Sequence, residues 1–98
     1  MLIRIVRMTF RPEESQNFLH LFAATSDKVR NFPGCHYLEL LQDYDDPHTF
    51  STYSKWTDDK ALTTYRESEL FHGVWAKTKA MFAAKPIAFS LKSHTRLA

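Results

Sequence analysis

Apolar and polar side chains alternate with a period of two along four stretches of the chain, which is the pattern of β-strands. These stretches are residues 2–10, 35–44, 49–56 and 87–93. The first of them carries apolar side chains on both of its faces. One face holds Ile3 and Ile5, and the other holds Leu2, Val6, Met8 and Phe10. A strand with two apolar faces is expected to be covered on both sides.

Apolar residues recur at intervals of three and four residues in two further stretches, which predicts two amphipathic helices. In the first, Pro12 and the two glutamates after it suit the start of a helix. In the second, Thr57 is expected to cap a helix with an acidic first turn. Ser68 and Glu69 have the chemistry of a second cap, so this helix is expected to kink or restart there, and Pro86 ends it.

The resulting order of elements, β-α-β-β-α-β, is that of the ferredoxin-like fold of the α+β class. The second and third strands are joined by a short connection, so they are expected to form an antiparallel hairpin. The four strands would form one antiparallel sheet with both helices on one face. Because the other face is also apolar, a monomer would leave it in water. We therefore expect a homodimer in which two sheets pack face to face into a barrel.

Length and composition limit the function further. A single domain of 98 residues, 1–98, buries only about 60–65% of the surface that its unfolded chain exposes, so its own core is thin. Aromatic residues make up 14% of the chain, and a partner subunit would help to cover them. The net charge is +2 and the basic residues are scattered, so nucleic acid is not an expected partner.

Several classes of site and location are not expected. The N-terminus has neither a long apolar stretch nor a small-residue cleavage site, and no apolar run is long enough to span a membrane. The single Cys35 cannot form an internal disulfide, which fits a reducing cytoplasm. The five histidines are dispersed without the spacing of metal ligands, and there is no Gly-rich phosphate loop, so we expect neither a metal nor a cofactor.

Side chains on the inward faces of the predicted elements are candidates for a small-molecule site. Tyr65 could line an apolar cavity and present its hydroxyl to a substrate oxygen, or it could be a core tyrosine bonded to the backbone. His72 would lie beside Tyr65 if the helix is continuous, and would otherwise be a histidine without chemistry. Aromatic side chains at such spacing are core residues first and pocket walls second. The candidates for the walls are Trp56, Trp75, Phe18 and Phe22, with His36 added from the second strand. Arg7 and Arg66 could meet an anionic ligand, although most arginines are simply exposed.

The sequence resembles a known family. The stretch "GCHYLELLQDYDDPHTFSTYSKWTDDKAL", followed by "SELFHGVWAKTKAMFA" and a final strand, is similar to the antibiotic biosynthesis monooxygenase family of dimeric α+β barrel proteins. The resemblance covers nearly the whole chain and implies the same fold and a homodimer. The activities that it implies are mixed. Some members oxygenate aromatic polyketides or quinols with O₂ and no cofactor, some degrade haem, and one group isomerises a small phosphorylated sugar derivative.

The residues that haem-degrading members use are not matched. Those members have an Asn late in the first strand, a Trp on the helix after the third strand, and a His further on, where this chain has Val6, Tyr65 and Trp75. In several other relatives a His stands in place of Tyr65. The tyrosine removes an imidazole that could move protons near neutral pH.

The resemblance therefore implies a cofactor-independent monooxygenase that acts on a small aromatic or quinol-type substrate between the sheet and the helices. Tyr65 and His72 would handle the proton and hold a substrate oxygen. The alternatives are a non-catalytic dimeric module that binds a small hydrophobic ligand, or an isomerase of a small metabolite with Arg and His in its cavity. Convergence of Tyr65 and His72 on one enclosed void would favour the enzyme, and a filled core would favour the module.

Overall fold

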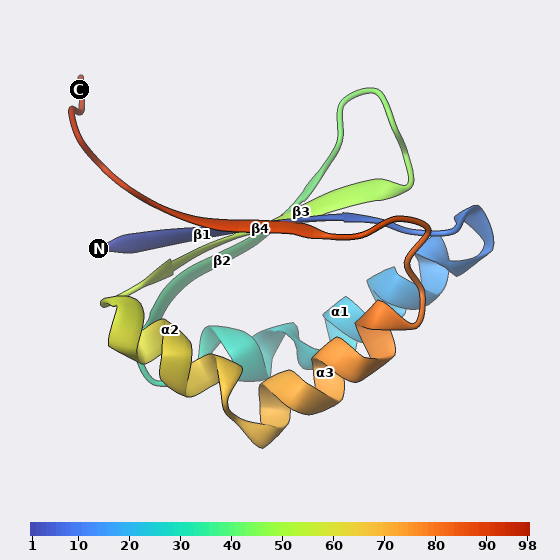
Figure 1. Ribbon diagram of the computed structural model, residues 1–98, viewed down its shortest axis with the longest axis horizontal. Coiled ribbons are helices and arrows are strands. Elements are labelled where there is room, and N and C mark those ends of the chain that lie inside the picture. The colour runs from blue at the N-terminus through green and yellow to red at the C-terminus, as the bar shows by residue number, and fades with distance from the viewer.

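The chain forms one antiparallel sheet of four strands in the order β2-β3-β1-β4, and all the helices lie on one face of it (Figure 1). The computed structural model describes residues 1–98. Its elements are β1 (Leu2–Thr9), the 3₁₀ turn η1 (Pro12–Glu14), α1 (Ser15–Arg30), β2 (Cys35–Gln42), β3 (Thr49–Trp56), α2 (Asp59–Arg66), α3 (Glu69–Lys79) and β4 (Ile87–Lys92). The predicted ferredoxin-like α+β fold is confirmed, with the second helical stretch divided in two.

The strand register decides which side chains meet the helices. β1 pairs with β3 so that Leu2 lies opposite Trp56 and Met8 lies opposite Phe50. Met8, Phe50 and Trp56 are buried beneath the helices. Because side chains alternate between the two faces of a strand, the even-numbered residues of β1 and β3 point to the helices and the odd-numbered ones point away.

The face that points away from the helices is open and apolar. β4 is exposed along its whole length, with Ile87 at 56% and Phe89 at 42% exposure. Tyr37 and Tyr53 lie edge to face, with ring centroids 5.7 Å apart, and contribute aromatic surface from β2 and β3. Figure 1 shows no helix on this side of the sheet, and the C-terminal residues extend away from the body. The bare apolar sheet face predicted from the strand pattern is therefore present.

The helix caps differ in part from the prediction. α2 is capped by Asp58, whose Oδ1 accepts the Ala61 N–H at 2.8 Å. Thr57 was expected in that role, but its hydroxyl instead lies 2.7 Å from Nε2 of His36. The predicted restart is confirmed, because the Ser68 Oγ accepts the Phe71 N–H at the start of α3. A side-chain cap of this kind satisfies a backbone N–H that has no partner within the helix.

Gly34 allows β2 to start against the helix layer. Its backbone has φ of +89°, and a Cβ placed there would lie 2.6 Å from the Cβ of Ala61. Its carbonyl accepts the Thr57 N–H at 2.9 Å, which ties the start of β2 to the end of β3. Glycine is the residue that tolerates both this conformation and this contact.

No helix of the structure has the length and apolar character needed to cross a membrane.

Candidate functional site

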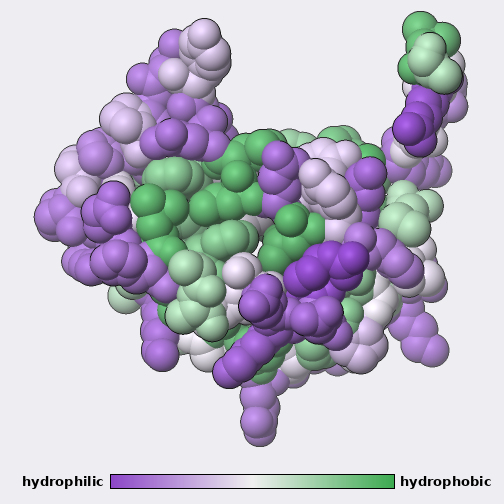
Figure 2. Space-filling model, turned by 180° about the vertical axis from the view of Figure 1, so that it is seen from behind, coloured by the Kyte–Doolittle hydropathy of each residue, from purple (hydrophilic) through white to green (hydrophobic).

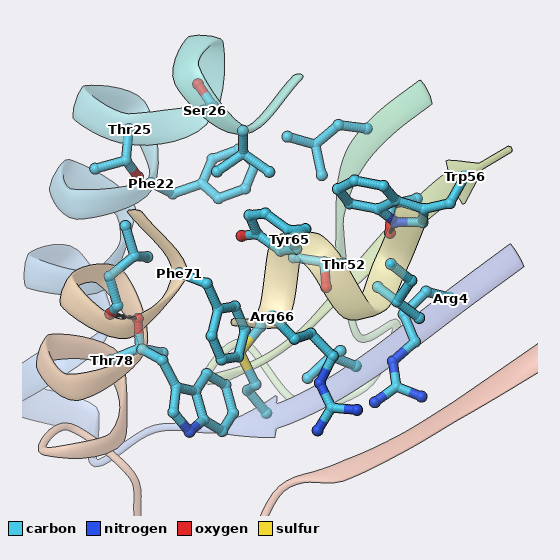
Figure 3. Close-up of a pocket in the computed structure, with 18 of the residues that line it drawn as sticks. Arg4, Phe22, Thr25, Ser26, Thr52, Trp56, Tyr65, Arg66, Phe71 and Thr78 are labelled. Carbon is cyan, nitrogen blue, oxygen red and sulfur yellow. Dashed lines mark hydrogen bonds between the residues drawn. The ribbon is translucent and has the colours of Figure 1, made fainter. Parts of the chain in front are cut away.

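A cavity of about 110 Å³ lies between the sheet and the helices. Its floor comes from the even-numbered residues of β1 and β3, and its walls come from α1 on one side and from α2 and α3 on the other (Figure 3). Most of the lining is apolar. The volume is comparable with the roughly 150 Å³ of an apolar cavity that holds one benzene molecule. As it stands, the cavity therefore suits a ligand with a single ring.

Apolar side chains also gather at the surface around a hollow. Figure 2 shows them on the side of the molecule opposite to the view in Figure 1, with hydrophilic side chains surrounding them. Pockets for small molecules commonly combine such an apolar lining with a few polar groups that fix orientation. The polar groups of the cavity therefore decide what it can do.

Tyr65 is fixed in the cavity wall by three aromatic neighbours. Its ring stacks on Trp56 with centroids 4.8 Å apart, and it meets Phe32 and Phe71 edge to face at 5.3 Å each. Its hydroxyl has no hydrogen-bond partner in the protein, and Figure 3 shows it pointing into the space between Phe22 and Phe71. Every fully buried polar side-chain atom does have a partner, so this hydroxyl faces accessible space. Tyr65 is thus not a core tyrosine bonded to the backbone.

The same packing changes the acidity of Tyr65. Burial, with a smaller repulsion from Cys35, raises its pKa to about 12. Burial acts in this direction because it disfavours the charged phenolate. At neutral pH the side chain is therefore a neutral phenol that can donate one hydrogen bond. Ionising it at pH 7 would cost about 7 kcal/mol, at 1.36 kcal/mol for each pH unit, so it is not a base.

Few other hydroxyls of the lining are free. The Thr25 hydroxyl donates to the Leu21 carbonyl, and the Thr78 hydroxyl donates to the Val74 carbonyl, both at 2.8 Å. The Ser54 Oγ accepts the Trp56 Nε1–H at 3.0 Å. Ser26 and Thr52 line the cavity without a hydrogen bond to the protein, so together with Tyr65 they are the neutral groups left to meet a ligand.

Two arginines line the cavity on the side next to β4. Arg4 comes from β1 and Arg66 from the end of α2, and Figure 3 shows both guanidinium groups turned the same way. Arg4 donates to the Ser90 Oγ at 3.1 Å, whereas Arg66 makes no hydrogen bond to the protein. The pKa of Arg4 lies below its ordinary value, first because of burial and then because of the charge on Arg66, while Asp59 acts in the opposite direction.

The structure brings most of the predicted site residues together. Five of them line the cavity, namely Tyr65, Trp56, Trp75, Phe18 and Phe22. The stacked and tilted contacts that join these rings also build the core, since Phe18 packs on Phe10 at 4.2 Å and Trp75 stacks on Phe71 at 5.8 Å. The same aromatic side chains therefore line the cavity and build the core.

The two predicted histidines lie outside the cavity. His72 was expected beside Tyr65, but the chain leaves the helix after Arg66 and α3 starts anew at Glu69, so the helical phase between the two residues is lost. His72 is exposed. His36 lies where the β2–β3 register shifts between Cys35 and Tyr37, which turns it away from the helix-facing row. It is exposed and contacts Thr57.

Sequence reasoning missed Arg4, although a signal was present. The helix-facing row of β1 reads Leu2, Arg4, Val6 and Met8, so a single charge interrupts an apolar row. Of the two arginines expected to meet an anionic ligand, Arg66 lines the cavity, whereas Arg7 lies on the opposite face of the sheet and forms an ion pair with Asp43 at 2.8 Å. No three His, Cys, Asp or Glu side chains lie together as metal ligands do.

Cys35 is a buried part of the core. It packs with Trp56 and Leu62, and its Sγ lies 3.6 Å from the Tyr37 carbonyl. Burial raises the pKa of its thiol, although the Tyr37 contact and the charge of Arg30 oppose the rise. A thiol of this kind is a poor nucleophile.

The sheet, its single helical layer and the apolar cavity between them define a ferredoxin-like protein with an apolar pocket beneath its helices. A profile of the family described as "Antibiotic biosynthesis monooxygenase" matches residues 1–77. The chain therefore belongs to the antibiotic biosynthesis monooxygenase family. A search of curated protein sequences gives no match.

Solved structures share the fold. A structure described as an antibiotic biosynthesis monooxygenase superposes with a TM-score of 0.90 at 24% identity, covering 97% of this chain and 100% of the other. PA3566 from Pseudomonas aeruginosa superposes with a TM-score of 0.81 at 27% identity, covering 99% of this chain and 94% of the other. A conserved protein from Methanosarcina mazei Go1 superposes with a TM-score of 0.89 at 18% identity, covering 96% of this chain and 94% of the other. At such identities, the likeness bears on the fold more than on the substrate.

Proposed function

We propose that the protein is a cofactor-independent monooxygenase that acts on a small aromatic or quinol-type substrate held between the sheet and the helices. The observation that carries the proposal is the Tyr65 hydroxyl, which is free of protein partners and faces an apolar cavity of about 110 Å³. Family membership supports the reaction class. The volume favours a substrate with one ring over one with three fused rings.

The role of Tyr65 is to donate a hydrogen bond to a substrate oxygen. With a pKa of about 12 it cannot remove a proton at neutral pH. Its phenol instead stabilises the negative charge that a hydroquinone oxygen carries once its proton has left for solvent. A hydrogen bond from a fixed donor to a developing oxyanion is a large term in many enzymes.

The oxidation itself is carried by the substrate. The deprotonated ring gives an electron to O₂, and recombination forms a carbon–oxygen bond. Loss of water from the hydroperoxide then leaves a hydroxyquinone. A hydroquinone and O₂ become a hydroxyquinone and one water, so the two hydrogens lost by the substrate provide the reduction and no external reductant is needed. The protein contributes an apolar site, orientation and the Tyr65 hydrogen bond.

Oxygen uptake tests this proposal. We expect single-ring hydroquinones to give uptake and hydroxyquinone product, and anthrones to give less because of the cavity volume. Tyr65→Phe should lower kcat/KM by about 10–100-fold, which is the value of one hydrogen bond to a charged oxygen. Tyr44→Phe, on an almost fully exposed residue, is the matched control.

His72→Ala separates this geometry from the arrangement expected for a continuous helix. Wild-type uptake places the histidine outside the reaction, whereas a large loss contradicts its position outside the cavity. If Tyr65→Phe consumes oxygen as fast as the wild type, the role given to the hydroxyl is wrong.

The second candidate function is a non-catalytic module that binds a small hydrophobic ligand. The observation in its favour is that neither His72 nor His36 lines the cavity, so the lining provides no base that acts near neutral pH. An isomerase was expected to have both Arg and His in the cavity, and only the arginines line it. Saturable binding of hydroquinones without oxygen uptake would favour the module over the oxygenase.

We also propose that the bare sheet face joins two copies of the chain. Ile87, Phe89 and Leu91 of β4 are 42–56% exposed there, and a soluble monomer rarely leaves so much contiguous apolar surface in water. Light scattering should give twice the 11.5 kDa mass of the chain. Phe89→Glu should shift the protein to monomer or precipitate, whereas His20→Glu on the exposed side of α1 should leave the dimer intact.

A further inference from the structure

Arg4 is the one charged residue in the helix-facing row of β1. Its neighbours in the helix-facing row of β1 are Leu2, Val6 and Met8. Arg4 is half-buried, and its only hydrogen bond to the protein goes to the neutral Ser90 hydroxyl. Removing part of the hydration shell from a charge is unfavourable unless a counter-charge replaces it. No carboxylate of the protein forms an ion pair with Arg4.

Arg66 adds a second positive charge at the same place. It follows Tyr65 directly at the end of α2 and lines the same cavity. Its charge is felt at Arg4, so the two guanidinium groups repel each other. The carboxylate of Asp59 offsets this repulsion in part, but it pairs with neither arginine within 4 Å. The fold thus holds two like charges beside an apolar cavity and leaves them without an anionic partner.

We propose that Arg4 and Arg66 form an anion-binding subsite of the cavity, and that the ligand is a single-ring aromatic compound carrying a carboxylate. This inference rests on the proposed function only in placing an aromatic ring in the cavity. The ring lies against Trp56 and the other aromatic walls, and the carboxylate points to the side next to β4, where the guanidinium groups lie (Figure 3).

The apolar end and the charged end of the cavity both fit such a ligand. A guanidinium group matches a carboxylate with two parallel N–H···O bonds, and Arg66 has all of its donors free. Arg66 and Ser90 are exposed, so the charged end of the ligand stays near solvent and only the ring has to lose its water. A neutral hydroquinone would fill the apolar part of the cavity and leave the arginine pair unmatched.

Binding of benzoate and of its neutral analogue benzamide tests the subsite. The two probes have one ring and nearly the same shape, and they differ in charge. Trp56 and Trp75 both line the cavity, so their fluorescence reports binding without any turnover. At low salt we expect benzoate to bind about tenfold more tightly than benzamide, with the preference shrinking as salt rises.

Single substitutions test whether the two arginines cause the preference for benzoate. Arg66→Gln and Arg4→Gln should each lower the affinity for benzoate to nearly that for benzamide, while the affinity for benzamide stays near the wild-type value. Lys60→Gln is the matched control, because it removes the same charge from an exposed position of α2 that does not line the cavity. Asp59→Asn should have the opposite sign and strengthen benzoate binding, because it removes the carboxylate that competes for the arginines.

Equal affinity of the wild type for both probes, or a preference that survives both arginine variants, would overturn the proposal, as would no binding of either probe. Arg66 is exposed, so its variant is expected to fold even if Arg4→Gln does not. The test is independent of the oxygenase proposal. A protein that consumes no oxygen can still prefer benzoate, and an oxygenase of neutral hydroquinones can show no preference.

Discussion

Replacing Tyr65 with Phe should remove a loss of stability that the wild type suffers at alkaline pH. The pKa of Tyr65 is raised to about 12 by burial, whereas a tyrosine in the unfolded chain has a pKa of about 10. The folded protein therefore holds this phenol proton more tightly than the unfolded chain does. The resulting stabilisation is present in full below pH 10 and is lost as the pH rises through 12.

The size of the effect follows from the difference of about two pKa units. At 1.36 kcal/mol per unit, Tyr65 contributes at most about 2.7 kcal/mol to the fall in unfolding free energy across this range. Below pH 9, Tyr65→Phe should change the unfolding free energy by less than about 0.5 kcal/mol, because the hydroxyl has no hydrogen bond to lose. The variant and the wild type should then diverge as the pH rises, with the variant the more stable.

Urea denaturation at pH 8, 10, 11 and 12 measures this divergence. Other groups also titrate in this range, including Tyr37, whose pKa is raised chiefly by its hydrogen bond to Glu39. The difference between the wild type and Tyr65→Phe cancels their contribution. Tyr44→Phe should follow the wild type, because its ring is 99% exposed in the folded protein. Parallel curves for the wild type and Tyr65→Phe would refute the claim that the phenol is buried in the cavity wall.

Three further outcomes are expected. Gly34→Ala should lower the unfolding free energy by about 1–2 kcal/mol or more, because φ is +89° and the new Cβ meets Ala61; an unchanged Tm would contradict this conformation. Gly73→Ala is the same substitution inside α3, where the new Cβ meets no atom within 4 Å beyond the adjoining backbone of its own helix, and it should raise the stability by about 0.5–1 kcal/mol in the same melts. Iodoacetamide should alkylate Cys35 at least about tenfold more slowly in the folded protein than in urea, and equal rates would show that the thiol is accessible.

The fold could be predicted from the sequence because several local signals agree. The alternation in "TFSTYSKW" gave the bounds of β3, and the cap at Ser68 gave the break between α2 and α3. The apolar side chains on both faces of β1 predicted the open sheet face. The cap of α2 was misplaced by one residue because Thr57 and Asp58 have the same capping chemistry, and only the contact of Thr57 with His36 separates them.

The candidate site was harder to predict, because a break or a register shift of one or two residues decides whether a side chain faces the cavity. A break of two residues after Arg66 was enough to move His72 out of the cavity, and a register shift of one residue at the start of β2 was enough to turn His36 outward. Arg4 was missed because its strand was interpreted by its apolar positions alone. A charge in an inward row becomes informative only when the sheet register shows what lies opposite it.

Nuclear magnetic resonance with hydroquinone under anaerobic conditions tests most directly whether the cavity is the binding site. If the ligand binds in the cavity, amide and indole signals from the floor and both walls, including Thr52, Thr25 and Trp75, should show saturable shifts, and the shifts should be weaker in Tyr65→Phe. Signals of Tyr53 and Phe89 on the bare sheet face should stay in place. Shifts confined to that face, or none at millimolar hydroquinone, would show that the cavity does not bind this substrate.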